Sequence, residues 1–357
     1  MIAGGGTGGH LFPGVAVAEE IISRHGDSEV LFVGTERGIE ARLLPELGWN
    51  LELIKISGIK TVGLRGAIRG MFRVPGALRQ SRKVIKKFKP DVVLGVGGYA
   101  SGPVVMMARL MRIPTAILEQ NSVPGLTNKI LGKFARTVFL SFEESRRFFK
   151  KKKIVMSGNP IRAEIRAAMT EPKQLPAATT PHLFVFGGSQ GAQAVNKLTV
   201  AALKLLRERG VELTVLHQAG KRNVEATQAM YAEAGLDVDC VGFISDMAHE
   251  YKRADLIVAR AGATSVAELG IVGRPALLIP YPHAADNHQV TNAAELVEAG
   301  AARMHLESDL TAEILADEIA EILGDAKLRA NMADKMLAFG KPDASAAVVD
   351  WCSEQLR

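Results

Sequence analysis

A short pattern that ends in a glycine-rich loop occurs twice in this chain, about 180 residues apart. Near the amino end, Ile2–Ala3 lead into Gly4–Gly9 and then into a helical stretch. In the second half, Phe184–Phe186 lead into Gly187–Ala192 in the same way. Each copy is typical of the first strand, loop and helix of a Rossmann-like unit. The repeat therefore predicts two such domains.

Short apolar runs separated by longer helical stretches continue through both halves of the chain. The runs are Val30–Val33, Val92–Gly95, Ala116–Leu118, Thr137–Leu140, Leu183–Phe186, Leu213–Leu216, Leu256–Val258 and Ala276–Ile279. They are continuous rather than alternating, which indicates strands buried on both faces, as in parallel sheets. The expected fold class is α/β, with doubly wound parallel sheets.

Composition places the boundary between the two domains. Residues 170–181 contain three prolines and few apolar side chains, which is typical of a linker. We predict a first domain at 1–162, a linker at 163–181 and a second domain at 182–340. Residues 341–357 are predicted to form a helix that packs back on the first domain. Because only three residues precede the first glycine loop, we also expect the first strand to begin upstream of Met1.

The net charge of +6 conceals opposite balances in the two halves. Residues 1–162 carry a net charge of +14, and the remaining residues carry −8. The asymmetry predicts different partners for the two domains, with something anionic on the basic one.

The basic charge is densest in residues 60–89, which hold ten basic side chains and no acidic one. Apolar side chains are interleaved with them, and such a mixed surface suits anionic lipid. The alternative is a solvated helix whose apolar side chains enter the core. Nucleic acid is disfavoured as a partner because no RNP-like aromatics or zinc knuckles accompany the charge. The expected membrane patch comprises Ile68, Arg69, Met71, Phe72, Arg73 and Arg79.

Other features of the whole sequence indicate where in the cell the protein is located. The sequence has no apolar run of about 18 residues, as a spanning helix would need. Its first residues lack the charged and apolar regions of a signal peptide. Cys240 and Cys352 alone cannot build a disulfide framework. We therefore expect a location in the cytoplasm or on the cytoplasmic side of a membrane.

The first glycine loop offers backbone N–H groups at a helix N-terminus, which favours a phosphate or pyrophosphate. Gly4, Gly6 and Gly9 fit GxGxxG, and with Glu36 they would also fit a dinucleotide site. The alternative is a tight turn of packing glycines. A second cluster, Gly95–Gly102, follows another strand, and we expect the two loops to form one anion site because strand C-terminal ends share an edge.

The sequence of the second predicted domain indicates a further anion site. Gly187–Gly191, with the Ser189 hydroxyl, is a second phosphate cradle. Glu268 follows the strand at Leu256–Val258, within the first turns of a helix, and can accept both hydroxyls of a ribose. The alternative for Glu268 is an acid that complements the helix dipole. Two anion sites suit a reaction between two phosphorylated substrates.

Taken in order, these loops resemble those of the MurG family, the transferases that convert lipid I to lipid II in peptidoglycan synthesis. The resemblance covers essentially the whole chain and implies the GT-B fold, two Rossmann-like domains that face a cleft. It rests on Gly4–His10 with Phe12–Gly14, Gly97–Pro103, Glu119–Asn121 with Gly125–Lys129, Gly158–Arg162, Gly187–Ala192, Arg260–Glu268, and Pro280–His283 with Gln289 and Asn292.

The resemblance implies a role for each matching residue. UDP-N-acetylglucosamine would lie on the second domain, with Ser189 on the diphosphate, Glu268 on the ribose and Ile244 near the uracil. The other donor contacts would be Thr7, Gly8, Gly9, Asn121, Arg162, Ala263, Thr264 and Gln289. The acceptor pyrophosphate would meet Gly5, Gly6, Gly97, Gly98, Tyr99 and Ser101.

The chemistry implied is transfer of N-acetylglucosamine with inversion, which needs a base for the acceptor hydroxyl. His10 is the first candidate, since its ordinary pKa suits proton uptake at neutral pH. Glu119 is the second candidate. The alternatives are a histidine that only hydrogen-bonds the loop and a strand-end acid that pairs with a base. No DxD-like pair lies beside the glycine loops, so we expect no metal or other cofactor.

The family further implies a peripheral protein on the cytoplasmic face of the inner membrane, with partners among cell-wall synthesis and division proteins. Three other functions stay open at this point. An NAD-dependent dehydrogenase would leave Gly187–Gly191 and Glu268 unexplained. A UDP-N-acetylglucosamine 2-epimerase would need no lipid patch. A non-catalytic sensor of UDP-sugars would form no product.

Overall fold

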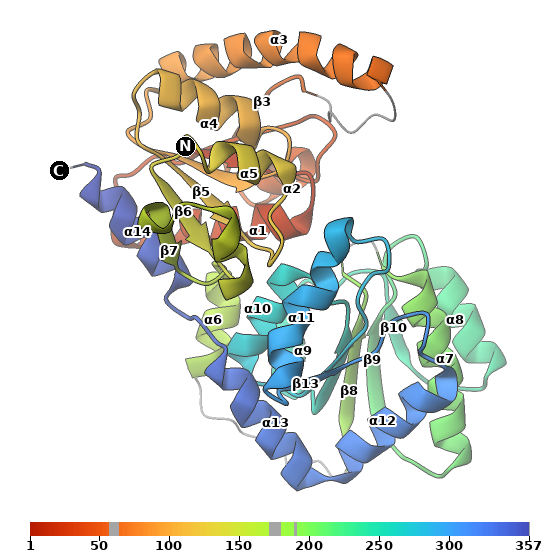
Figure 1. Ribbon diagram of the computed structural model, residues 1–357. Coiled ribbons are helices and arrows are strands. Elements are labelled where there is room, and N and C mark those ends of the chain that lie inside the picture. Colours follow the sequence, from red (N-terminus) through yellow and green to blue (C-terminus); the bar gives the residue numbers. More distant parts are fainter. Residues whose placement is uncertain (57–63, 171–179, 189–190, 357) are drawn as a thin grey trace. The chain divides into compact units, whose positions relative to one another are not determined.

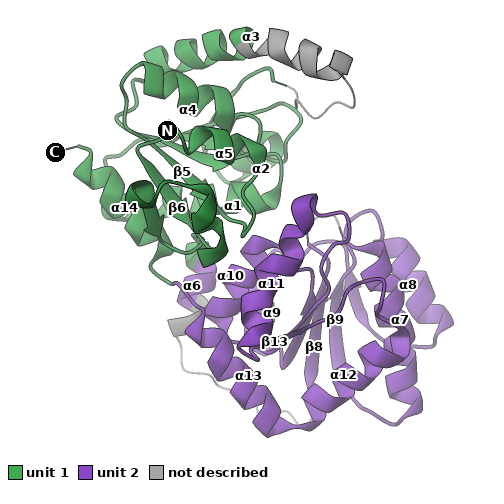
Figure 2. Ribbon diagram, viewed as in Figure 1, with its two compact units in different colours: residues 1–163, 342–357 green, residues 164–341 purple. Residues whose placement is uncertain are grey.

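The computed structural model describes residues 1–56, 64–170, 180–188 and 191–356, and of residues 64–74 and 168–170 it describes the backbone alone. The chain divides into two compact units (Figures 1 and 2). Unit 1 comprises residues 1–163 and 342–357, and unit 2 comprises residues 164–341. Both are α/β units, as the alternation of apolar runs and helical stretches predicts.

Unit 1 is built on a seven-stranded sheet in the order β3-β2-β1-β4-β5-β6-β7, and every pairing of neighbours is parallel. Its strands are β1 (Ile2–Gly4), β2 (Leu31–Gly34), β3 (Asn50–Leu53), β4 (Val93–Gly97), β5 (Thr115–Glu119), β6 (Thr137–Leu140) and β7 (Ile154–Met156). The helices are α1 (Gly8–Arg24), α2 (Glu40–Glu46), α3 (Leu64–Phe88), α4 (Ser101–Leu110), α5 (Leu126–Leu131), η1 (Glu143–Phe148), η2 (Lys151–Lys153) and α14 (Ala344–Glu354).

Helices cover both faces of this sheet, because successive strand side chains point to opposite sides. Ile2 and Phe32 enter one apolar core with α1, α2 and α14. Their neighbours Ala3 and Val33 enter a second core with α3, α4 and α5. The sheet is therefore doubly wound.

The last helix, α14, belongs to unit 1 although it follows the whole of unit 2 in sequence. Val348, Val349 and Trp351 lie in the same core as α1. The Trp351 ring meets that of Phe139 edge-on, with their centroids 5.9 Å apart. The burial of these apolar side chains is what holds the chain end on unit 1.

Unit 2 is built on a six-stranded sheet in the order β10-β9-β8-β11-β12-β13, also with parallel pairings. The strands are β8 (His182–Phe186), β9 (Thr214–Gln218), β10 (Asp239–Val241), β11 (Leu256–Ala259), β12 (Ala276–Leu278) and β13 (Ala302–Met304). The helices are α7 (Gln193–Glu208), α8 (Val224–Glu233), α9 (Met247–Arg253), α10 (Ala263–Val272), η3 (Ala285–Asn287), α11 (His288–Glu298), α12 (Ala312–Gly324) and α13 (Ala326–Ala338). Helix α6 (Ala163–Thr170) lies in the stretch predicted as a linker.

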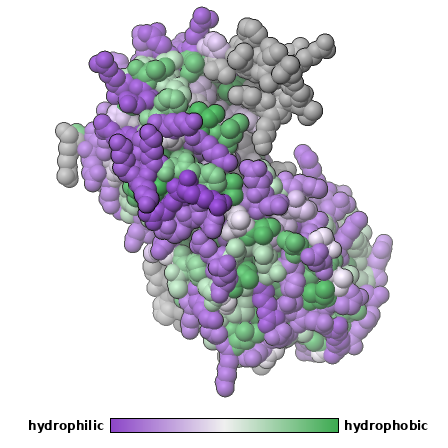
Figure 3. All heavy atoms as spheres, in the orientation of Figure 1, coloured by the Kyte–Doolittle hydropathy of each residue, from purple (hydrophilic) through white to green (hydrophobic). Residues whose placement is uncertain are grey.

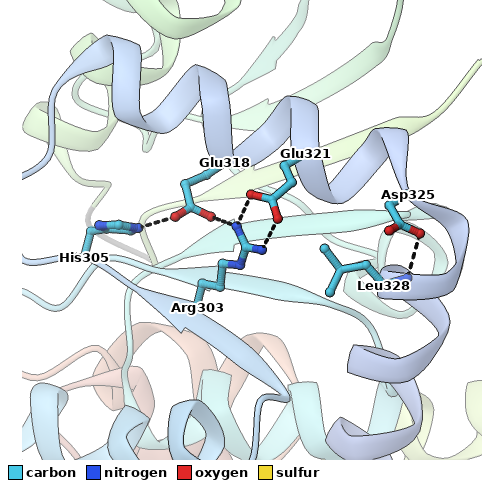
Figure 4. Close-up of polar contacts among 6 residues, drawn as sticks. All are labelled: Arg303, His305, Glu318, Glu321, Asp325 and Leu328. Atoms are coloured by element: carbon cyan, nitrogen blue, oxygen red, sulfur yellow. Dashed lines mark hydrogen bonds and ion pairs between the residues drawn. The ribbon is translucent and has the colours of Figure 1, made fainter.

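A charged cluster joins the edge strand β13 to α12 (Figure 4). Arg303 donates to both oxygens of Glu321, at 2.7 and 2.8 Å, and to Glu318. The ring of His305 contacts the other oxygen of Glu318 at 2.8 Å. These side-chain hydrogen bonds tie the edge strand of the sheet, as described, to the helix that follows it.

Hydrophobic residues form small groups among hydrophilic ones on the face drawn in Figure 3. Within residues 1–56, 64–170, 180–188 and 191–356, no helix is both long and apolar enough to cross a membrane.

Candidate functional site

The two glycine loops of unit 1 meet where the strand order of the sheet reverses. Strands β1 and β4 are neighbours, so the loops that follow them leave the sheet at one edge. The Gly5 N–H donates to the Gly97 carbonyl oxygen at 3.3 Å. A Cβ on Gly98 would lie 2.3 Å from the Gly5 carbonyl oxygen, so only glycine permits this approach. Ligands of open α/β sheets bind at such a point.

Beneath the first loop lies the carboxylate of Glu40, a residue that the sequence analysis did not name. Its Oε2 accepts the Gly6 N–H at 2.6 Å, and its Oε1 accepts the N–H and the hydroxyl of Thr35 at 2.9 and 3.0 Å. The side chain is 1% exposed. A Cβ on Gly34 or Gly38 would come within 2.4 or 1.9 Å of it, so these glycines create its space. Glu40 therefore ties the first loop to the end of β2.

These bonds bear on the predicted acceptor contacts of Gly5 and Gly6. In this conformation both N–H groups donate within unit 1, to Gly97 and to Glu40. A pyrophosphate that reached them would have to replace those acceptors. The sequence signal for Glu40 is a glutamate at a helix start shortly after Gly34 and Gly38. Glu36, which was considered for a dinucleotide site, is exposed.

His10 lies in the first turn of α1, with its ring next to the second glycine loop. Its Nδ1 is 3.3 Å from the Thr7 hydroxyl, and its Cδ2 would lie 2.6 Å from a Cβ on Gly97. Gly8 and Gly9 begin the same helix. The N–H groups of a first helical turn point toward the helix start, so this end of α1 favours negative charge.

Glu119, the second candidate base, ends β5 and is 1% exposed. Its Oε1 accepts the Asn121 N–H at 3.0 Å, and its Oε2 accepts the Asn128 side-chain amide at 2.9 Å. Burial raises the pKa of the Glu119 carboxyl, and the hydrogen bonds from these asparagines oppose that shift. The carboxylate thus holds the loop that carries Asn121.

Tyr99 and Ser101 follow the second glycine loop but differ in accessibility. The Tyr99 side chain is half exposed, whereas Ser101 is fully buried with its hydroxyl beside Gly95. Ser101 is the first residue of α4, and in this conformation neither its hydroxyl nor its backbone is exposed to an anion. Arg162, the predicted donor contact, stacks its guanidinium over the Phe12 ring, 4.7 Å from the centroid.

Unit 2 has its own reversal point, between β8 and β11. The loop after β8 begins at Gly187, and Ser189 within it lies outside the described residues. After β11, Ala263 and Thr264 open α10. Both loops leave the same edge of the sheet, which is where a nucleotide binds in this topology.

Glu268 lies in α10 and is 6% exposed. Its Oε2 accepts the Tyr251 hydroxyl at 2.8 Å. Tyr251 is itself buried, and its ring packs edge-on against Phe184 and Phe186 of β8. The aromatic cluster therefore fixes the Glu268 carboxylate relative to the central strand.

Two further predicted donor contacts also follow strands of unit 2. Ile244 lies three residues after β10 and is partly exposed. Gln289, in α11, accepts the Tyr281 N–H at 2.9 Å and so fastens the loop after β12. Arg260 fastens the same loop from the other side, donating to the carbonyl oxygens of Ile279 and Pro280 at 3.1 and 3.0 Å.

The predicted membrane patch falls on α3. Arg79 is exposed on this helix. The other five residues of the patch, Ile68, Arg69, Met71, Phe72 and Arg73, have side chains outside the described part of the chain.

The structure thus gathers the described donor and acceptor candidates into one group in each unit, at the carboxyl edges of the two sheets. Two family models match the chain. The glycosyltransferase family 28 N-terminal domain matches residues 1–140, and the glycosyltransferase family 28 C-terminal domain matches residues 182–348.

Two curated relatives carry the name UDP-N-acetylglucosamine–N-acetylmuramyl-(pentapeptide) pyrophosphoryl-undecaprenol N-acetylglucosamine transferase. The protein from Myxococcus xanthus is 48% identical and aligns over 99% of this chain and 91% of its own length. The protein from Syntrophus aciditrophicus is 49% identical, over 100% and 98%.

Among solved structures, MurG of Acinetobacter baumannii matches with a TM-score of 0.79 and 34% identity, over 99% of this chain and 98% of its own. The UDP-GlcNAc 2-epimerase of Neisseria meningitidis matches with a TM-score of 0.68 and 14% identity, over 99% of each chain, and shares the fold alone. The two-domain GT-B fold expected from the sequence is confirmed by these matches. The chain therefore belongs to glycosyltransferase family 28 and, within it, to the MurG family of N-acetylglucosaminyltransferases.

Proposed function

We propose that this chain transfers N-acetylglucosamine from UDP-N-acetylglucosamine to the muramyl 4-hydroxyl of undecaprenyl-pyrophosphoryl-MurNAc-pentapeptide, converting lipid I to lipid II in peptidoglycan synthesis. The observation that carries the proposal is the near-full-length identity of 48–49% to transferases named for this reaction. The presence of an anion-favouring sheet edge in each unit supports it, because both substrates carry a diphosphate.

The donor is assigned to unit 2. Glu268 would accept the ribose hydroxyls, and its support is a carboxylate fixed by Tyr251 beside the reversal point. The backbone near Ile244 would meet the uracil, and Ser189 with Ala263 and Thr264 would meet the diphosphate. Gln289 would contact the sugar.

The acceptor is assigned to unit 1, with its pyrophosphate on Gly97, Gly98 and Tyr99, and on Ser101 only where the loop moves to uncover that residue. Gly5 and Gly6 join this set only when the pyrophosphate replaces the acceptors that now hold their N–H groups. Thr7, Gly8, Gly9, Asn121 and Arg162 would approach the donor sugar from unit 1.

In the reaction, the acceptor oxygen forms a bond to C1 of the sugar while the bond from C1 to the UDP oxygen breaks, which inverts C1. His10 would take the proton of the attacking hydroxyl, a role supported by its place between the two glycine loops. A positioned base contributes about 10²–10⁴ in rate. The UDP leaves with the electron pair, and N–H groups at the unit 2 loops would stabilise its charge.

Glu119 is better suited to positioning than to proton transfer. It is buried, and hydrogen bonds from Asn121 and Asn128 occupy both of its oxygens. We assign it the role of holding the loop that presents Asn121.

We further assign the chain to the cytoplasmic face of the inner membrane as a peripheral protein. The support is the basic charge of residues 60–89, whose members Arg79, Arg82, Lys83, Lys86, Lys87 and Lys89 are exposed. Proteins of cell-wall synthesis and division are the partners that fit this place.

The test is a product assay with labelled UDP-N-acetylglucosamine and lipid I. We expect β-linked label in lipid II. Label that stays on UDP as the 2-epimer, or no product under any condition, would overturn the proposal.

His10→Ala tests the base, with His25→Ala as the control at the other end of α1, where the histidine is exposed. His10→Ala should lower kcat about 10²–10⁴-fold with little change in the donor KM. An unchanged kcat with a raised donor KM would remove His10 from the role.

A further inference from the structure

A basic pocket of about 310 Å³ lies in unit 1, at the edge of the sheet opposite the glycine loops. Thr115 is the first residue of β5, Arg136 directly precedes β6, and Lys153 directly precedes β7. In a parallel sheet all strands begin at one edge, so this pocket lies away from the transfer site. Its lining is Arg109, Arg112, Ile113, Pro114, Thr115, Phe134, Ala135, Arg136, Lys152 and Lys153.

Five of the lining side chains are cationic, and the described lining contains no carboxylate. Within the described part of the chain, none of the five forms an ion pair. The pocket therefore concentrates positive charge that the protein leaves uncompensated, and such a site favours an anion.

Neutral acceptors hold three of these cations in place. The Lys153 ammonium donates to the carbonyl oxygens of Lys133 and Ala135 at 2.9 and 2.7 Å. Arg109 Nε donates to the Phe134 carbonyl oxygen at 3.2 Å, and Arg136 donates to the side chain of Gln355, directly after α14. Their charges are thus positioned without being neutralised.

Lys153 is affected both by burial and by the neighbouring positive charges of the pocket. The pKa of Lys153 is lowered, first by desolvation and then by repulsion from Lys150, Arg109 and Lys152. The hydroxyl of Thr115 is buried and has no hydrogen-bond partner in the described structure. An anion carrying oxygen atoms would relieve the repulsion.

Arg112 reaches the pocket from the turn after α4, with a φ of 63°. Glycine is the residue that usually ends a helix in this left-handed conformation, and another residue there costs about 1 kcal/mol. The chain places an arginine at that position, and its side chain is exposed.

We propose that this basic pocket is a phosphate-binding site of unit 1, separate from the transfer site, that takes a phosphate ester. The ester can be the head group of an anionic lipid or a small soluble phosphate. Phe134 in the lining and Leu110 next to Arg109 are 44% and 67% exposed, and such apolar side chains suit the lipid source. The pocket is large enough for a phosphate and the first atoms of the group it esterifies.

The test compares Arg112→Gly with Lys89→Gly in the full-length protein. Lys89 is also exposed and left-handed, with a φ of 53°, but does not line the pocket. Each substitution removes one positive charge from unit 1 and suits the backbone. Because Lys89 belongs to the basic stretch 60–89, Lys89→Gly measures how much of the binding that stretch and the diffuse charge of unit 1 supply without the pocket. The probes are sn-glycerol 3-phosphate in calorimetric titration, and flotation with vesicles of phosphatidylcholine with or without phosphatidylglycerol.

Arg112→Gly should weaken one or both of these interactions about tenfold, the loss expected for one hydrogen bond to a charged group, and Lys89→Gly much less. If the two variants differ in their affinity for glycerol 3-phosphate, the site takes soluble esters. If they differ only in their binding to vesicles, the site takes a lipid head group. If the two variants behave alike with both probes, the proposal is overturned. Transfer to a water-soluble acceptor should be unchanged in Arg112→Gly, which separates this result from a failure of the proposed function.

Discussion

Glu40→Gln should release the first glycine loop from the end of β2. The carboxylate accepts the Gly6 N–H at 2.6 Å through one oxygen, and the N–H and hydroxyl of Thr35 through the other. The glutamine amide has one carbonyl oxygen, which can accept a hydrogen bond, and one NH₂ group, which only donates. If the carbonyl keeps Thr35, the NH₂ group faces the Gly6 N–H, and two donors cannot bond.

The cost follows from the bonds that are lost. Removing a hydrogen bond to a charged group costs about 1.5–3 kcal/mol. With a urea m-value of about 2 kcal/mol/M for a unit of this size, the midpoint should fall by about 1 M. The kcat for transfer should fall about tenfold or more, because a displaced loop misplaces the reacting groups.

Tryptophan fluorescence during urea unfolding reports the stability of unit 1, the unit that contains Glu40. The two tryptophans of the chain, Trp49 and Trp351, both lie in unit 1 and pack against its core. Glu36→Gln is the matched control, because Glu36 is exposed four residues earlier. If Glu40→Gln and Glu36→Gln unfold at the same urea concentration with the same kcat, the role given to Glu40 is wrong.

Three further predictions concern the glycine contact, a buried histidine and the charged cluster. Gly98→Ala should lower kcat about tenfold or more, since its Cβ would lie 2.3 Å from the Gly5 carbonyl oxygen and part the loops; a wild-type kcat would contradict this. Burial lowers the pKa of His217 to about 4, so the unfolded chain takes up a proton near pH 6.5 while the folded chain does not. The free energy of unfolding should therefore fall as the pH drops below about 6.5, by about 2 kcal/mol between pH 7 and pH 5. Hydrogen exchange of the β9 amides should show this fall in the wild type and not in His217→Gln. Arg303→Met should lower the melting temperature by about 2 °C or more, whereas Arg209→Met, which breaks a more exposed pair with Asp317, should change it by less than about 1 °C; equal shifts would show that the cluster adds nothing.

The sequence predicted the interior strands well because their burial leaves a plain signature. The run at Thr137–Leu140 coincides with β6, and Val92–Gly95 overlaps β4. The strands β3, β7, β10 and β13 were not predicted, and they are the four edge strands of the two sheets. An edge strand has a partner on one side only, and in β3 and β7 no residue is fully buried. The continuous apolar run that marks a central strand is therefore missing.

The site was less predictable than the fold because its contacts join distant parts of the chain. The meeting of the two glycine loops was predicted from the sequence, because the ends of parallel strands share an edge of the sheet. The role of Glu40 depends on space left by Gly5, Gly34 and Gly38, which only the folded loop brings together. The hydrogen bond from Tyr251 to Glu268 likewise depends on the packing of α9 against β8.

The most direct test of the whole account is a crystal structure of the protein soaked with UDP. We expect the nucleotide at the carboxyl edge of the unit 2 sheet, with the Glu268 carboxylate on the ribose hydroxyls and the diphosphate at the loop after β8. A nucleotide bound instead to the Gly4–Gly6 loop of unit 1, with Glu268 touching no ligand, would contradict the assignment of the donor to unit 2.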